Sequence, residues 1–183
     1  MDTKLKHRGS IDTLVYPFIY ESSSLCDYEV LTDELCARLC GLIDEVADLG
    51  FKQLLAELQE EVYHANGSIR GKLALSPQQV EHRIADYRSL KQLISPKIDG
   101  FTLPRGSSPI AELNLAKSNC KKIIRILVRV REEGIDVPQH LAEYFNVLGN
   151  LFFTMSILII QARNETLVPF ISKSYPNRSQ PHD

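Results

Sequence analysis

The sequence predicts an all-α fold, a single bundle of five helices. Three observations support this: apolar residues recur at steps of three and four along most of the chain, Ser-Pro and Gly residues interrupt that pattern, and few segments resemble strands. The length of 183 residues fits one domain, and 44% apolar with 24% charged residues is typical of a globular protein. Antiparallel bundle packing would bury such apolar stripes.

The first two predicted helices follow an irregular N-terminal segment, residues 1–24. An apolar stripe that ends at Leu49 marks the first helix, and Gly50 breaks it. A second stripe begins near Phe51 and ends around Asn66. Their short connection predicts that the two helices pack side by side in opposite directions.

The third and fourth helices carry start signals of the same kind. Ser76 precedes a proline, and Gln79 follows at the position that completes a capping box. That helix is expected to end just before Pro96, because a residue that precedes proline avoids the helical conformation. A second Ser-Pro pair begins the fourth helix at Ser108, and Gly134 stops it.

The last predicted helix runs from about Pro138 to about Arg163 and is apolar on more than one face. Such a helix is buried by several neighbours or by another subunit. Its longest apolar stretch, residues 147–160, is interrupted by polar residues and is too short to cross a bilayer. With no apolar leader at the N-terminus, we expect a cytoplasmic protein without a membrane partner. The bundle is assigned to residues 25–169 and a flexible tail to residues 170–183.

Charge and spacing argue against several functional classes. A net charge of −2 provides no basic field for nucleic acid, so no nucleic-acid partner is expected. No His or Cys spacing typical of a metal site occurs, so no bound metal is predicted. Glu57, Glu60 and Glu61 are interpreted as a solvated helix face.

Two polar patterns interrupt the apolar stripes of the last two helices. Lys117, Lys121 and Arg125 are four residues apart, so like charges align on one side of a helix and repel each other. They form either a solvated face or an anion site. Asn146 and Asn150, also four apart, either line a site or form a hydrogen-bonded pair in the core, because a buried amide needs partners.

Four segments together are similar to those of the PduO-type ATP:cob(I)alamin adenosyltransferases. That family shows F-x-L-P-x-G, then R-x-x-C-R-R-x-E-R, then L-N-R-L-S-D-x-L-F, after a helix start G-T-x-D-E-L. The segments here are Thr32–Leu35, Phe101–Ser107, Cys120–Arg125 and Tyr144–Phe152, and the similarity spans about residues 26–163. The resemblance implies the family's five-helix bundle and transfer of the adenosyl group of ATP to cobalt(I) of cobalamin, with release of triphosphate. It also implies magnesium on the ATP and a homotrimer with its active site between subunits.

The resemblance also assigns roles to individual residues. It places nucleotide binding on Lys117, Lys121, Lys122, Arg125 and Asn146, and we add the basic N-terminal residues Lys6 and Arg8. Catalytic roles fall on Lys117, Arg125 and Asn150. Phe101 matches the family's corrin-facing Phe, thought to crowd out the lower axial ligand of cobalt; the alternative is a loop anchor that packs on the end of the bundle.

The match is better on the corrinoid side than on the ATP side. Lys117 replaces an Arg, Asn150 replaces an Asp, and Ile124 replaces a Glu of the family pattern. Two lysines replace the paired arginines after Cys120, and the family's N-terminal phosphate loop T-K-T-G-D-x-G is not visible. We therefore hypothesise a divergent member whose adenosyl transfer is weakened or lost. The alternative is a non-catalytic binding or assembly protein on the same scaffold.

Overall fold

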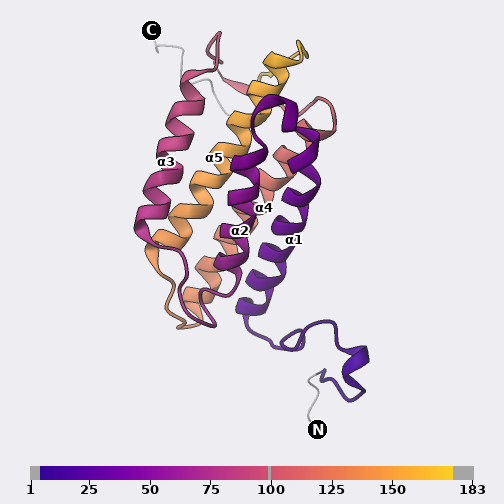
Figure 1. The fold of residues 1–183 in the computed structure, drawn as a ribbon. Coiled ribbons are helices and arrows are strands. Elements are labelled where there is room, and N and C mark those ends of the chain that lie inside the picture. The colour runs from indigo at the N-terminus through magenta and orange to yellow at the C-terminus, as the bar shows by residue number, and fades with distance from the viewer. Residues whose placement is uncertain (1–4, 99, 175–183) are drawn as a thin grey trace.

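A computed structural model of the chain describes residues 5–98 and 100–174 and confirms the predicted bundle (Figure 1). Five long helices account for most of the described residues: α1 Ser24–Glu45, α2 Lys52–Asn66, α3 Pro77–Gln92, α4 Ser108–Glu132 and α5 Gln139–Ala162. Two short 3-10 helices, Ile11–Thr13 and Ala47–Leu49, lie before α1 and between α1 and α2.

The helix boundaries follow the predicted start and stop signals. The Ser76 hydroxyl accepts a hydrogen bond from the Gln79 backbone N–H, and the Gln79 side chain accepts one from the Ser76 N–H at 2.8 Å, which completes the capping box. Gly134 adopts a left-handed φ of 85° just after α4, as a helix stop requires. Helix α3 ends at Gln92, a few residues earlier than the proline signal indicated.

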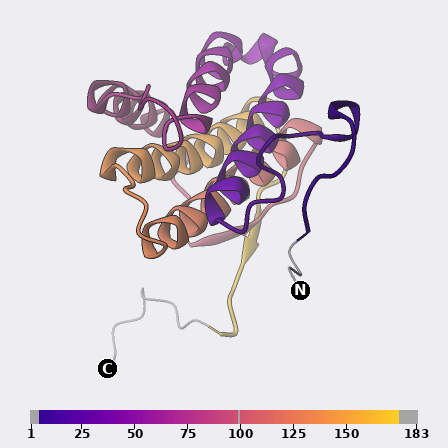
Figure 2. The same cartoon turned by 90° about the horizontal axis from the view of Figure 1, so that it is seen from below.

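Helix α5 lies at the centre of the bundle (Figure 2). It packs against α3 on one side and α4 on the other, while α1 packs against both α2 and α4. This confirms that several neighbours bury the last helix. With 24 residues, α5 is long and apolar enough to cross a membrane, so the sequence argument about its length was wrong. In this fold it has the position and the burial of a core helix.

A small antiparallel sheet was not predicted. Strand β1 (Phe101–Leu103) pairs with β2 (Val168–Phe170), and Phe101 lies opposite Phe170. Three-residue strands leave too little alternation for a sequence pattern to reveal. The second strand includes Phe170, the first residue of the segment assigned to a flexible tail; residues 175–183 lie outside the described part.

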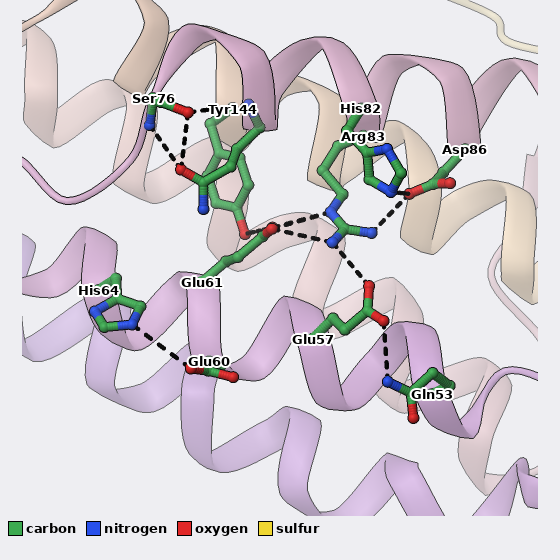
Figure 3. Close-up of polar contacts among 11 residues, drawn as sticks. Gln53, Glu57, Glu60, Glu61, His64, Ser76, His82, Arg83, Asp86 and Tyr144 are labelled. Atoms are coloured by element: carbon green, nitrogen blue, oxygen red, sulfur yellow. Dashed lines mark hydrogen bonds and ion pairs between the residues drawn. The ribbon is translucent and has the colours of Figure 1, made fainter.

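A buried ion network joins α2, α3 and α5 (Figure 3). The Arg83 guanidinium is 5% exposed and donates to Glu61 at 3.0 Å and to Glu57 at 2.9 Å. Tyr144 of α5 donates to the same Glu61 oxygen, Oε2, at 3.0 Å, and Asp86 accepts from Arg83 at 2.7 Å. Although burial alone would lower the pKa of Arg83, the carboxylates around it raise that pKa, so the guanidinium stays charged.

The predicted solvated face of α2 is therefore wrong for Glu61, whereas the Glu57 side chain is still 41% exposed. Glu61 is 7% exposed and Glu57 binds Arg83, whereas Glu60 remains exposed. The sequence offered no signal for this, because the partner lies 22 residues away on another helix.

Replacing Arg83 with Met tests the importance of the network. The change leaves Glu61 buried without its counterion, which we expect to lower the free energy of unfolding by about 3–5 kcal/mol. Urea denaturation would measure the loss. Arg88→Met, on the same helix but at an exposed position, is the matched control and should stay within about 0.5 kcal/mol. Equal stability of the two variants would contradict the account.

Candidate functional site

A groove of about 280 Å³ runs between α4 and α5 and collects much of the predicted site. Helix α4 contributes Lys117 and Lys121, and helix α5 contributes Asn146 and Asn150. The remaining lining residues are Cys120, Ile124, Phe145, Gly149 and Phe153. Within the part of the chain that the structure describes, none of the lining residues is acidic, so this groove is cationic with an apolar floor.

Lys117 is the most constrained cation of the groove. Its ammonium donates to the Asn114 side-chain oxygen at 2.7 Å and lies 4.9 Å from the centre of the Phe153 ring. Burial lowers the pKa of Lys117, and the positive charge of Lys121 lowers it further. An anion placed between the two ammonium groups would relieve this repulsion, which favours anion binding over a plain solvated face.

The two asparagines line the groove and do not form a core pair. Both side chains are exposed, and the Asn146 amide donates back to the Ala142 carbonyl at 2.9 Å. The interpretation of a hydrogen-bonded pair in the core is therefore wrong. Both amides are accessible to a ligand that enters the groove.

Two of the predicted phosphate-binding cations lie outside the groove. Lys122 is exposed and is not among the residues that line the groove; its charge makes only a small contribution to the lowered pKa of Glu34, which Arg38 lowers most. Arg125 is exposed one turn beyond Lys121 and is not among the residues that line the groove. Helix geometry explains the separation, because consecutive residues are rotated by about 100° and adjacent lysines face different neighbours.

The other predicted residues lie at the two ends of the bundle (Figure 1). Phe101 is 60% exposed on β1, near the end of α5, so it does not pack as a loop anchor. Glu165 fixes the loop that follows β1, since its carboxylate accepts from the Ser107 N–H at 2.9 Å and the Ser107 hydroxyl at 2.6 Å. Lys6 and Arg8 are exposed on the N-terminal segment, which extends from the opposite end, where α1 begins.

A second, larger pocket of about 530 Å³ lies between α3 and α5. Its apolar lining comes from Tyr87, Ile94, Ile98 and Phe153, and its volume falls within the usual range of small-molecule sites. Phe153 therefore lines both cavities. Sequence reasoning missed this residue because it follows the end of the motif segment and is one of many apolar side chains on α5.

Comparison with known proteins identifies the family of the chain. The sequence profile of the family described as cobalamin adenosyltransferase matches residues 23–159, most of the chain. The chain belongs to the cobalamin adenosyltransferase family. A protein named cobalamin adenosyltransferase from Cupriavidus metallidurans is 27% identical over 136 residues, which cover 71% of each chain.

Solved structures of the Lactobacillus reuteri PduO-type ATP:corrinoid adenosyltransferase have the same fold. A variant complexed with cobalamin and ATP superposes with a TM-score of 0.72 at 15% identity, over 82% of this chain and 86% of that one. A second variant, complexed with ATP, gives 0.63 at 17% identity over 83% and 90%. At such identities the likeness establishes the fold of the cobalamin adenosyltransferase family and no individual contact.

The departures from the family motif are concentrated in the groove. Ile124, where the motif has Glu, contributes an apolar side chain to the lining, and Asn150 contributes a neutral amide in place of Asp. Lys117 therefore faces Asn114 and the Phe153 ring rather than a carboxylate. This cobalamin adenosyltransferase relative keeps the positive charge of the site and lacks its negative charge.

Replacing Lys121 with Gln tests the electrostatics of the groove. Loss of the neighbouring positive charge should raise the pKa of Lys117 toward its ordinary value, measured by NMR titration of the lysine ε-carbon. Lys122→Gln is the matched control: that side chain lies outside the groove and is not among the causes of the lowered pKa of Lys117, so the pKa should stay unchanged. The same upward shift in both variants would show that Lys117 responds only to overall charge.

Proposed function

We propose that this protein is an ATP:corrinoid adenosyltransferase whose activity is weakened by the substitutions in its groove. The nucleotide lies in the α4–α5 groove and the corrinoid in the α3–α5 pocket. The observation that carries the proposal is that Phe153 lines both the cationic groove and the apolar pocket. The Lactobacillus reuteri structures of the same fold, which hold cobalamin and ATP, support this choice of substrates.

The proposed reaction is a displacement at the ribose 5′ carbon of ATP. Cobalt(I) supplies the electron pair for the new cobalt–carbon bond, the bond from that carbon to the phosphate oxygen breaks, and triphosphate leaves. Lys117 and Lys121 neutralise the charge that develops on the leaving group, and magnesium bound with the ATP would supply further positive charge there. Asn146 and Asn150 orient the nucleotide through their exposed amides.

The corrinoid side of the site needs an apolar environment. Phe153, Tyr87 and Ile98 provide the apolar lining that excludes water from the macrocycle. Phe101 is exposed on β1, at the end of the bundle. In the proposed complex, Phe101 crowds the lower face of cobalt. An exposed Phe with no packing role in one chain supports a role in contact with a ligand.

The altered groove is the reason to expect a slow reaction. Lysine offers a compact charge and cannot make the two parallel hydrogen bonds that an arginine makes to a phosphate. With Asn150 and Ile124 in place of acidic residues, no lining carboxylate orients the lysines. Loss of one well-placed charge contact in a transition state typically costs a factor of 10²–10³ in rate, roughly 3–4 kcal/mol.

We also propose a cytoplasmic homotrimer with the site between subunits. The N-terminal cations Lys6 and Arg8 lie at the end of the bundle where α1 begins, and neither lines the groove of its own chain. Assembly with a neighbouring chain would allow the basic segment of one subunit to complete the phosphate site of the next. Exposed apolar side chains on α4, Leu115 and Val128, are compatible with such contacts.

The second candidate is a non-catalytic corrinoid-binding or assembly protein on the same scaffold. The replacement of Glu by Ile124 and of Asp by Asn150 favours it, because both changes remove charge from the groove and leave the α3–α5 pocket unaffected. Such a protein would bind a corrinoid without transferring an adenosyl group to it.

An anaerobic assay with cob(I)alamin and magnesium ATP tests the proposed activity. We expect slow formation of the cobalt–carbon bond, followed in the visible spectrum, and a further loss of at least tenfold in Lys117→Ala, because its ammonium lines the groove. Lys122→Ala, which lies outside the groove, is the matched control and should keep its rate. Equal losses in both variants would contradict the placement of the nucleotide.

Restoring the family residues separates the two candidates. The triple variant Lys117→Arg, Ile124→Glu and Asn150→Asp should raise the rate at least tenfold if the groove is a weakened active site. No turnover in either protein, together with a spectral change when cob(II)alamin is added, would establish the non-catalytic candidate.

Light scattering of the purified protein tests the assembly. Chains of 20.7 kDa should give a particle of about 62 kDa, the mass of a trimer. A monomeric mass at the concentrations used for the assay would contradict a site shared between subunits.

A further inference from the structure

Three cations at the mouth of the α3–α5 pocket have no role in the reaction described above. Arg88 and Lys91 are exposed on the last turns of α3, and Lys97 is exposed on the loop that leads to β1. All three line the pocket, and among the described residues 5–98 and 100–174 none that lines it is acidic. The pocket therefore has an apolar floor, and the charged residues described at its rim are all cationic.

The acidic side chain of α3 closest in sequence to this rim is already engaged. Asp86 accepts a hydrogen bond from Arg83 at 2.7 Å, inside the buried network that joins α3 to α2. It is therefore held by the buried network as the partner of Arg83. Arg88, two residues further along the helix, points to the pocket instead.

Helix electrostatics account for only part of the rim. A cation in the last turn of a helix, such as Lys91, is stabilised by the helix dipole. Lys97 lies beyond the end of α3, and its place in the pocket lining has no such explanation. Lys91 also lies 5.5 Å from the Tyr87 ring, which keeps its charge over the apolar floor.

We propose that this rim selects corrinoids that carry an anionic group outside the macrocycle. The ring would occupy the apolar floor beside Tyr87 and Phe153, and the anionic group would lie among Arg88, Lys91 and Lys97. Two groups share this chemistry: the phosphodiester of the nucleotide tail and a free carboxylate at the ring periphery. The inference rests on the proposed function, because it assumes that the pocket holds a corrinoid.

Three ligands distinguish the alternatives in a spectroscopic titration of the full chain. Cob(II)alamin carries the phosphodiester, cobyric acid carries a free carboxylate and no tail, and cob(II)inamide carries neither. We expect at least one anionic ligand to bind about tenfold more tightly than cob(II)inamide. The ligand that gains affinity identifies the group, and the gain should shrink as salt is added.

A charge-removal variant tests whether the rim causes the preference. Arg88→Gln, Lys91→Gln and Lys97→Gln together should weaken the anionic ligand about tenfold and leave cob(II)inamide unchanged. Because all three positions are exposed, the variant should fold normally, which circular dichroism would check.

The control variant removes three positive charges elsewhere. Lys72, Arg129 and Arg131 are exposed, and none of them lines the pocket; changing all three to Gln should leave both affinities unaltered. Equal affinity for all three corrinoids, or equal losses in the rim and control variants, would overturn the inference while the proposed function stands. Failure of every corrinoid to bind the unaltered protein would overturn the proposed function and the inference with it.

Discussion

The Arg83 network is the interaction on which the arrangement of the site depends. Helix α3 is largely polar, and only Val80 and Arg83 are buried along its length. Its attachment to α2 therefore rests on charge pairing with Glu61, while Tyr144 connects the same carboxylate to α5. Because a buried pair requires good geometry, the network fixes how α3 is rotated about its axis. That rotation in turn places Tyr87 at the pocket between α3 and α5.

Helix α5 separates two environments that the proposed chemistry needs. One side faces α4 with its lysines, the other faces α3 with its apolar pocket, and Phe153 lines both cavities. In the proposed reaction the polyanionic leaving group needs positive charge around it, whereas the metal centre needs an apolar environment without water. Phe153, an apolar residue that lines both cavities, separates these two environments. The substituted motif positions Lys117, Ile124 and Asn150 line the groove on the α4 side, and none of them lines the pocket on the α3 side.

Sequence patterns predicted the helices well because helix stripes and capping residues are local signals. The capping box at Ser76 and the stop at Gly134 both occur as expected. Patterns of spacing also grouped Lys117 with Lys121 correctly, but they could not separate Lys122, which lies outside the groove. The missed features, such as the Arg83 network and Phe153, depend on packing between distant segments. Neither the buried Arg83–Glu61 pair nor the position of Phe153 between two cavities changes the spacing of apolar residues along the chain, so no sequence pattern reveals them.

The central claim, two cavities that share Phe153, is tested most directly by NMR of the protein with its two substrates. Cob(II)alamin is paramagnetic, so in the α3–α5 pocket it should broaden the ring signals of Phe153 and Tyr87. Magnesium ATP should shift the side-chain signals of Lys117, and Tyr63, which lies on α2 and lines neither cavity, should report neither ligand. Broadening centred on Tyr63, or a Lys117 signal that ignores ATP, would contradict the account.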